Sequence, residues 1–388
     1  MTVISKDERG FAMVTAIFVM AMLIGVTAAA LRMSQSDIAA SRNYRGSSQS
    51  LFAAEAGVAH AVGIINQAGV INLQNDVYGV WTGHQAPFGA SPQPMAQQAG
   101  YFYSVSIAMD PYRPGDPNRG VLTATGTGSD NSLRTVVARI VKSGVPAAPP
   151  GAIYLATDNP TDATFNGNNF EINGNDVNYS NGLAGPKPAV PGITTRTEAN
   201  AQETRDSLSN QQKDNVQGLG YIPGNPDTPS VSATQGMSSA QINQMITDLL
   251  ALPHTTWAGD IHGGDTLGTS TPPPGHPQIT YLPGNGSGVT ENGNASGAGI
   301  MIVENALNIN GNFNFDGLII VRGTTQVTDV TGSATIFGSI WTTDFNLTVG
   351  GHADIQYSSE ALALANQSGS GVPPLPAPVV VTSWRDVF

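Results

Sequence analysis

The chain has 388 residues, no cysteine and a formal net charge of −12. The absence of cysteine excludes a disulfide framework and a cysteine-ligated metal site, and the acidic balance argues against nucleic acid and anionic lipid as partners. With 45 glycines, 26 prolines and only 11% charged residues, the composition indicates turn-rich β structure in which helix is the minority.

An uncharged apolar run of 21 residues, Phe11 to Leu31, follows directly after charged residues. At about 1.5 Å per residue, a helix of this length spans roughly 30 Å, the thickness of a bilayer's hydrocarbon core. A cleaved secretory signal has a shorter apolar core of about 7–15 residues, so it is the weaker interpretation. The run predicts one membrane-spanning helix, and a simple uncleaved anchor remains an alternative at this point.

The helical pattern continues beyond the membrane run. Apolar residues recur at three- and four-residue spacing at Leu51, Ala54, Val58, Val62 and Ile65. We therefore expect one long helix over about residues 11–66, half in lipid and half packed along a soluble domain. Gly25 and Gly46 weaken it locally, each by about 1 kcal/mol relative to alanine.

Three segments of alternating apolar and polar residues follow, starting at Tyr101, Val121 and Leu133. Turn sequences rich in proline, glycine and aspartate separate them. The pattern predicts an antiparallel β-meander over about residues 101–142, against which the soluble half of the helix can pack.

The order of "ERGFAMVTAIF", then "AASRNYRGSSQSLFAAEAGVAHAV", then the meander resembles the PilX-type minor pilins of type IV pili. More distantly, it is similar to the large tip minor pseudopilin of type II secretion systems. The resemblance implies that residues 1–10 are a leader, that a prepilin peptidase cuts after Gly10, and that the new N-terminus at Phe11 is methylated. Residues 11–143 are then the pilin module.

One position departs from the major pilins, which carry a glutamate as the fifth residue after the cut. Here that position is Thr15, which cannot supply the charge that is thought to pair with the N-terminal amine of a neighbouring subunit. Either minor pilins vary at this site, or this subunit has no neighbour above it. Thr15 and Gly25 are the candidate assembly residues in the membrane run.

A proline- and glycine-rich stretch at residues 144–152 predicts a linker to a second, β-rich module at residues 153–366. A looped and helical insertion is expected over about residues 183–295. It contains one clear helix, with Ser238 and Gln241 spaced as a capping box and Pro253 as a stop.

Segments beginning at Gly311, Gly332 and Gly351 align at offsets of 21 and 19 residues. These offsets fit the coils of a β-solenoid, in which Ile319, Ile340 and Ile355 point inward. An antiparallel sandwich is the alternative that the same short strands allow. The expected fold class is therefore α+β: a long pilin helix on an antiparallel meander, followed by a β-rich, solenoid-like module.

The last segment, residues 367–388, is a proline-rich linker followed by a strand-like run from Val379. As a dangling tail it would expose Val381, Trp384 and Phe388. We expect it to return and cover a sheet edge.

Enzymatic signatures are absent from the sequence, so no catalytic residue and no cofactor is predicted. Two clusters of possible metal ligands occur in the sequence, and no metal site is predicted at either of them. The first is a loop cluster of His254, Asp260, His262 and Asp265. The second, a calcium hypothesis, consists of Asp158, Asp162, Glu171 and Asp176.

The predicted function is that of a minor pilin at the tip, or in the initiation complex, of a type IV pilus or related filament. Its expected partners are other minor pilins, the major pilin and the prepilin peptidase. The precursor is expected in the inner membrane, with its C-terminal domain outside the cytoplasm, and the mature protein at the extracellular pilus tip. Two alternatives remain: a membrane-anchored surface adhesin that keeps residues 1–10, and a polysaccharide-acting β-helix enzyme.

Overall fold

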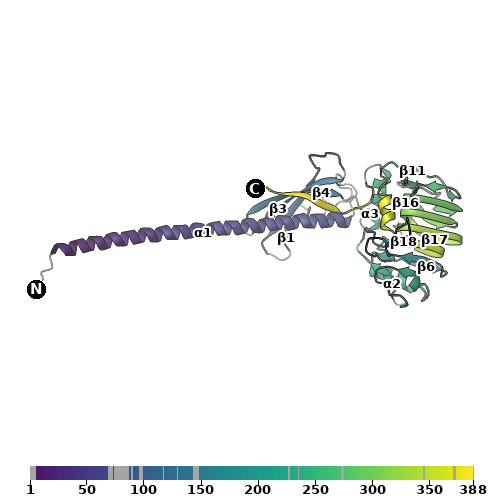
Figure 1. Cartoon of the computed structure of the whole chain (residues 1–388), viewed down its shortest axis with the longest axis horizontal. Coiled ribbons are helices and arrows are strands. Elements are labelled where there is room, and N and C mark those ends of the chain that lie inside the picture. The colour runs from purple at the N-terminus through teal and green to yellow at the C-terminus, as the bar shows by residue number, and fades with distance from the viewer. Residues whose placement is uncertain are drawn as a thin grey trace.

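A long N-terminal helix, a small antiparallel sheet beside its second half and a larger β-rich module at its far end make up the molecule (Figure 1). The computed structural model describes residues 6–68, 73, 87–88, 91–95, 99–116, 118–128, 130–142, 148–225, 228–234, 236–271, 275–343, 346–369 and 373–387. Residues 1–5 of the predicted leader and residues 144–147 of the predicted linker lie outside the described ranges.

The helix α1 runs from Lys6 to Ala68, close to the predicted span. It packs on a five-stranded antiparallel sheet whose strand order is β1-β2-β3-β4-β19. These strands are Gln93–Pro94, Phe102–Ala108, Arg119–Thr127, Leu133–Lys142 and Val379–Val387. The meander over residues 101–142 is therefore present, and the C-terminal strand pairs with the sheet edge at β4 as the sequence predicts.

Glycine lets the helix and the sheet approach closely. A β-carbon on Gly126 of β3 would lie 2.0 Å from the backbone carbonyl oxygen of Ser50 on α1. A β-carbon on Gly46 would lie 2.3 Å from Oδ2 of Asp130. From the sequence alone, Gly46 is a weak point of the helix, whereas in the structure it allows close packing at the start of the helix–sheet contact.

The β-rich module is here called the outer module. Its strands pair in parallel, whereas the strands of an antiparallel sandwich would pair in opposite directions. The long strands are β16 (Asn294–Ile309), β17 (Asn312–Thr342) and β18 (Asn346–Tyr357), and they pair in register over most of their length. The shorter strands are β5 (Ile153–Leu155), β6 (Asp162–Asn166), β7 (Glu171–Asn173), β8 (Ile193–Thr195), β9 (Val216–Gln217), β10 (Val231–Ala233), β11 (Thr255–Thr256), β12 (Ile261–His262), β13 (Thr266–Leu267), β14 (Gln278–Leu282) and β15 (Val289–Asn292).

The spatial order of the strands differs from their order in the chain. The first strands of the module, β5, β6 and β7, pair with its last strands, β17 and β18. From there the chain adds β8 and β10 on one side, crosses through α3 (Ser239–Leu250), and builds β11, β14 and β16 from the other side. The first and last strands of the module therefore lie side by side in the middle of its stacked strands.

The expected insertion over residues 183–295 needs correction. Strands β8 to β15 of this segment pair with the same sheet as the rest of the module, so the segment is part of the stack and not an addition to it. Strands of only two to five residues are too short to show a periodicity, which is why the sequence did not reveal them.

Buried side chains hold the stack together. Ile319, Ile340 and Ile355 have no exposed surface, as predicted. Gly317, with φ of +147°, marks a bend in β17, where a β-carbon would lie 2.0 Å from the carbonyl oxygen of Gly299 in the next strand. Only glycine fits this backbone conformation and this spacing together.

Three helices and one short 3-10 turn complete the described part of the module. They are α2 (Glu198–Ser207), the turn Lys213–Asn215, α3 and α4 (Ser359–Ala365). The capping box of α3 is present, with Ser238 and Gln241 bonded reciprocally as the sequence predicts. The buried side of α3 consists of Ile242, Met245, Ile246 and Leu249, all in the module's core.

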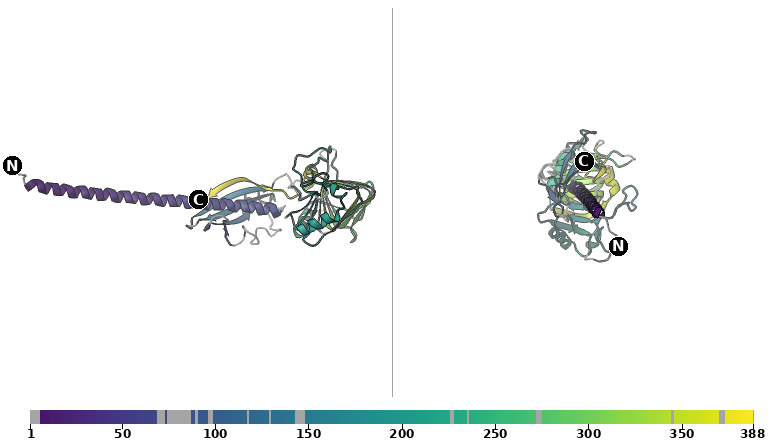
Figure 2. Two further views of the ribbon diagram at one scale, coloured as in Figure 1. Left: turned by 90° about the horizontal axis from the view of Figure 1, so that it is seen from below. Right: turned by 90° about the vertical axis from the view of Figure 1, so that its left-hand side faces the viewer.

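The outer module joins the smaller sheet through two neighbouring strands, because the chain leaves from β4 and returns into β19 (Figures 1 and 2). The described part of the return segment is packed, since Pro374, Leu375, Pro376 and Ala377 are buried. The fold is α+β, with a long N-terminal helix on an antiparallel sheet, followed by a parallel β-rich module.

Candidate functional site: the exposed helix and the module junction

The first part of α1 touches no other part of the described chain. All 35 residues from Phe11 to Arg45 are exposed, and burial begins at Gly46, where the sheet starts. The apolar window of α1 is long enough to cross a membrane and is not buried in the protein. Exposed apolar side chains continue beyond the membrane run, at Met33, Ile38 and Tyr44.

The polar side chains of the run Phe11–Leu31 are bonded within the helix. The Thr15 hydroxyl donates a hydrogen bond to the carbonyl oxygen of Phe11 at 2.7 Å, and the Thr27 hydroxyl donates to that of Leu23 at 2.7 Å. A threonine bonded in this way carries no unsatisfied donor into lipid. Thr15 therefore needs no charged partner, unlike a glutamate at the same position.

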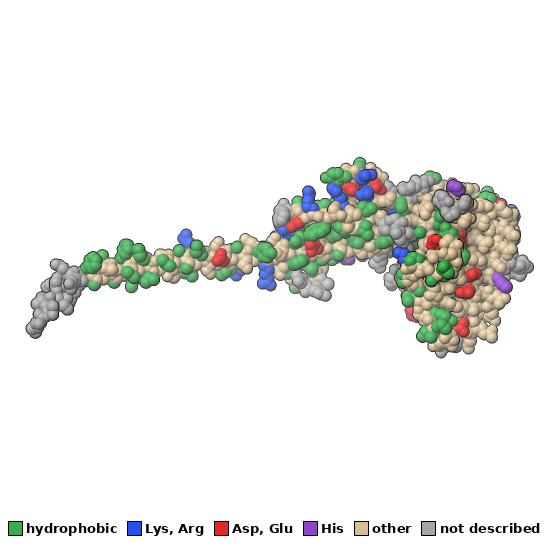
Figure 3. Space-filling view, in the orientation of Figure 1, with side chains coloured by type: hydrophobic (Ala, Val, Ile, Leu, Met, Phe, Trp, Pro, Cys, Tyr) green, Lys and Arg blue, Asp and Glu red, His purple; other side chains and the backbone are tan. Residues whose placement is uncertain are grey.

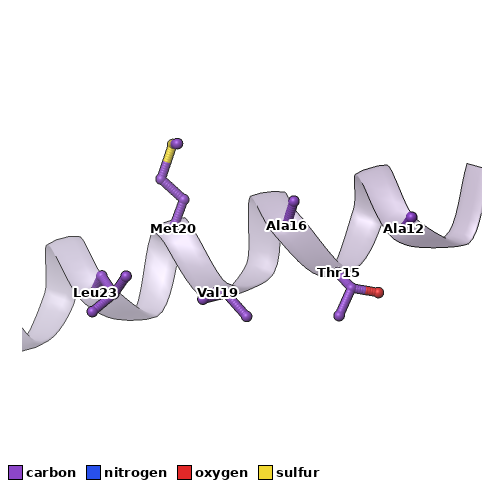
Figure 4. Close-up of a pocket in the computed structure, with 6 residues that line it drawn as sticks. All are labelled: Ala12, Thr15, Ala16, Val19, Met20 and Leu23. Carbon is purple, nitrogen blue, oxygen red and sulfur yellow. The ribbon is translucent and has the colours of Figure 1, made fainter.

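Thr15 lies in a shallow groove along one side of α1 (Figure 4). The groove is lined by Ala12, Thr15, Ala16, Val19, Met20 and Leu23, which recur at the three- and four-residue spacing of one helix side. The small residues Ala12 and Ala16 leave room beside the larger Met20 and Leu23. Such an alternation of small and large side chains suits the approach of a second helix.

The other predicted residues of the helix occupy simple positions. Gly10 lies inside α1, and Phe11 next to it is 77% exposed. At Gly25 an added β-carbon would meet nothing within 4 Å, and the helix continues through it unbroken. Cleavage after Gly10 stays a prediction, as does an assembly role for Gly25.

The calcium candidates do not converge. Asp158 pairs with Arg196, whose Nε lies 2.7 Å from Asp158 Oδ1. Asp176 is buried, and its two carboxylate oxygens accept hydrogen bonds from the backbone of Lys187 and from both the backbone and hydroxyl of Ser359. Asp176 thus fastens a loop to the start of α4.

The carboxylates of the histidine-containing loop are likewise engaged in hydrogen bonds with the backbone. Asp265 accepts a hydrogen bond from the backbone N–H of His262, and Asp260 accepts one from that of Thr290. Among the described residues, no group of three or more His, Cys, Asp or Glu side chains is arranged to hold a metal ion.

The junction between the modules has polar contacts that the sequence did not indicate. The Lys142 ammonium group on β4 donates a hydrogen bond to the carbonyl of Pro373, and the N–H of Val379 donates one to Oδ1 of Asn66 on α1. Burial lowers the pKa of Lys142 to about 8. At the other end of β19, Arg134 and Asp386 form an ion pair at 2.6 Å.

Charge is distributed unevenly along the molecule. Residues 148–372 contain five Lys and Arg against nineteen Asp and Glu, a formal charge of −14, whereas the rest of the chain carries eleven against nine, or +2. Lys and Arg side chains gather over the smaller sheet (Figure 3). The acidic outer module therefore disfavours nucleic acid and other polyanions as its ligands.

The prediction for β19 was correct in pairing but incomplete in burial. Val380, Val381 and Trp384 remain 48%, 43% and 56% exposed after the strand has paired with β4. The pattern "VVVTSW" indicates a strand, but it does not show whether that strand lies inside a sheet or at its edge. In the structure, β19 is the last strand in the order of the described sheet.

Comparison with known proteins gives few matches. No protein-family model matches the chain, and no curated protein matches it. Among solved structures, the chain is similar to the crystal structure of competence-associated pilin ComZ from Thermus thermophilus, with 13% sequence identity and a TM-score of 0.23. The match covers 88% of this chain and 97% of that one, and a TM-score this low gives no residue-by-residue correspondence.

Proposed function

We propose that the chain is a minor pilin-like subunit, located at the tip or in the initiation complex of a type IV pilus or related filament. In this proposal it acts as a structural subunit and not as an enzyme. The observation that carries the proposal is the form of α1, whose first 35 described residues from Phe11 are exposed while its last part packs on an antiparallel sheet. A helix of this kind needs lipid before assembly and neighbouring helices after it.

Two independent features support a position at the end of a filament. The outer module lies at the far end of α1, where it extends beyond the small sheet in the direction away from the N-terminus (Figure 1). Thr15 is satisfied by the carbonyl of Phe11, so it does not require the amine of a preceding subunit. A subunit in the shaft would have to accommodate the outer module between the subunits above and below it.

The outer module is proposed to be a β-solenoid that is presented outward for interaction or adhesion. In-register parallel pairing along β16, β17 and β18 supports this interpretation. The offset of 19 residues that the sequence suggested recurs in the pairing of Ser333 with His352. Other minor pilins and the major pilin are the proposed partners of α1, and the inner membrane holds the precursor.

Processing by a prepilin peptidase provides the first experiment. Intact-mass analysis of the membrane-extracted protein is expected to give a chain that starts at an N-methylated Phe11. The Gly10→Val variant should remain as precursor, and so should the wild-type protein in a host without the peptidase. A mature protein that keeps residues 1–10 would instead identify an anchored surface adhesin.

Location in the filament provides the second experiment. Because the chain has no cysteine, Ser287→Cys in an exposed turn of the outer module gives one labelling site for gold. Gold at one end of each filament is expected. Regular decoration along the shaft would exclude the tip position.

A further inference from the structure

The free edge of the small sheet is a second candidate interaction surface. The strand β19 is the last in the order β1-β2-β3-β4-β19, and within the described residues only β4 pairs with it. In an antiparallel strand, alternate residues point their backbone N–H and C=O groups away from the paired neighbour. One side of β19 thus offers a row of backbone donors and acceptors to another molecule.

This edge lacks most of the features that protect exposed edges. Residues 379–384 contain neither charge nor proline, and three of them are partly exposed large apolar side chains. Soluble proteins usually place lysine, proline or a covering loop at such positions, because an open apolar edge promotes association. An edge of this composition is the kind that becomes covered in an assembly.

A bulge in β19 places two of these three apolar side chains, Val381 and Trp384, on the same face. Val381 pairs with Ile140 and Ser383 with Arg139, so Thr382 is the additional residue. Val381 and Trp384 are three residues apart, a spacing that would place them on opposite faces of a regular strand. With the bulge, they lie opposite Ile140 and Ala138, two residues of the core formed with α1.

The membrane is too distant to cover this surface. At one end of β19, Val379 bonds to Asn66; at the other, Asp386 pairs with Arg134, whose strand neighbour Gly126 touches Ser50. The strand therefore lies beside α1 between Ser50 and Asn66. Eighteen residues of helix, roughly 27 Å, separate Ser50 from Arg32 at the end of the membrane run.

We propose that β19 docks an extended β-strand from a neighbouring pilin-type subunit, with Val381 and Trp384 as the apolar contacts. The partner's chemistry follows from the edge: its backbone groups require a strand, and a helix would leave them unpaired. Val381 and Trp384 lie on the face of the sheet that carries α1, so a pilin-type subunit that packs on the exposed part of the helix would approach β19 from this side. This inference rests on the proposed function, since it names a partner within the filament.

Site-directed cross-linking in the full-length protein, expressed with its own filament system, tests the inference. Ser383→Cys places one benzophenone-labelled cysteine on β19, and Ser106→Cys on β2 is the matched control on an exposed residue of the same sheet. Irradiation is expected to join Ser383→Cys to a strand peptide of another pilin-type subunit, identified by mass spectrometry. Ser106→Cys should give at most about one tenth of that yield.

A second variant pair separates contact from folding. Trp384→Ser combined with Val381→Lys is expected to weaken the association about thirtyfold, a loss typical of an aromatic contact at the centre of an interface. Phe102→Ser, which removes a partly exposed aromatic side chain from β2, should leave the cross-linking yield of Ser383→Cys unchanged. An unchanged melting temperature in both variants shows that the fold is kept.

Three results would overturn the inference: cross-linking to a second copy of this chain, cross-linking to lipid or to no partner, or equal yields from β19 and β2. The proposed function is judged separately by recovery of the protein in sheared filaments. A protein that reaches filaments normally with Trp384→Ser and Val381→Lys, and without a cross-link at Ser383→Cys, disproves the β19 contact alone. A protein that never reaches filaments disproves the function.

Discussion

Lys142 donates a hydrogen bond to the backbone carbonyl of Pro373 at 2.7 Å, and so links the last residue of β4 to the segment that returns from the outer module. The two residues are separated by 231 positions in the chain, yet they lie at the same end of the small sheet. This hydrogen bond therefore fastens the returning segment to the small sheet at the end where the outer module is attached.

Burial of Lys142 predicts a pH dependence of stability. Its pKa falls from 10.5 in the unfolded chain to about 8, so between these values the folded protein binds fewer protons than the unfolded chain does. The free energy of unfolding should therefore rise with pH across this window, by up to about 3 kcal/mol. In Lys142→Met, measured by denaturant unfolding at pH 7.5 to 10.5, this rise should disappear. Equal pH slopes for both proteins would contradict the prediction.

The contact between α1 and the sheet can be tested by replacing glycine with alanine at two positions, one inside the contact and one outside it. Gly126→Ala places a β-carbon 2.0 Å from the Ser50 carbonyl oxygen, and should destabilise the small sheet by about 3 kcal/mol. Gly63→Ala, on the helix where nothing lies within 4 Å, should be neutral or stabilise by up to about 1 kcal/mol. Thermal unfolding of both variants provides the measurement, and similar shifts of the two would argue against close helix–sheet contact.

The packing of the outer module can be tested by placing a charged side chain at a buried position and at an exposed position of the same strand, β17. Ile319→Asp buries an unpaired carboxylate in β17, and should cost at least about 4 kcal/mol, enough to unfold the module. Asn314→Asp, on an exposed position of the same strand, should change stability by less than about 0.5 kcal/mol. Near-ultraviolet circular dichroism of the two variants distinguishes them. Native spectra from Ile319→Asp would exclude the burial of Ile319.

Thr15 gives a prediction about assembly. Thr15→Ser keeps a hydroxyl that can bond to the Phe11 carbonyl, and should be recovered in filaments like the wild type. Thr15→Glu brings a carboxylate into lipid at a cost of about 3 kcal/mol, and a tip subunit has no preceding amine to offset it. Its recovery in sheared filaments, measured by quantitative immunoblotting, should fall severalfold. Increased recovery of Thr15→Glu would instead indicate a shaft position.

The elements that the sequence predicted well are those with long, regular patterns. The apolar run from Phe11 and the spacing of Ala54, Val58 and Ile65 define a helix without reference to the rest of the chain. The alternation from Leu133 to Lys142 does the same for β4. In such segments, local periodicity and tertiary packing require the same structure.

The features that the sequence did not reveal depend on distant partners. Nothing local in "ITT" or "IYL" indicates that β8 and β5 pair with each other, or that β5 pairs with β17 almost two hundred residues later. The ion pair of Arg134 and Asp386 joins residues 252 positions apart. From the sequence we predict Thr15 as an assembly residue but not the groove around it, although the three- and four-residue spacing of the lining residues is visible there.

The insertion of the outer module between β4 and β19 has a mechanical consequence. A pull on the outer module is shared by two backbone segments, which enter the small sheet side by side at Lys142 and Val379. The load acts along the strands, so it shears a row of hydrogen bonds together instead of opening them one after another. Two attachment points also resist twisting, so a torque on the outer module is passed on to α1 through the sheet.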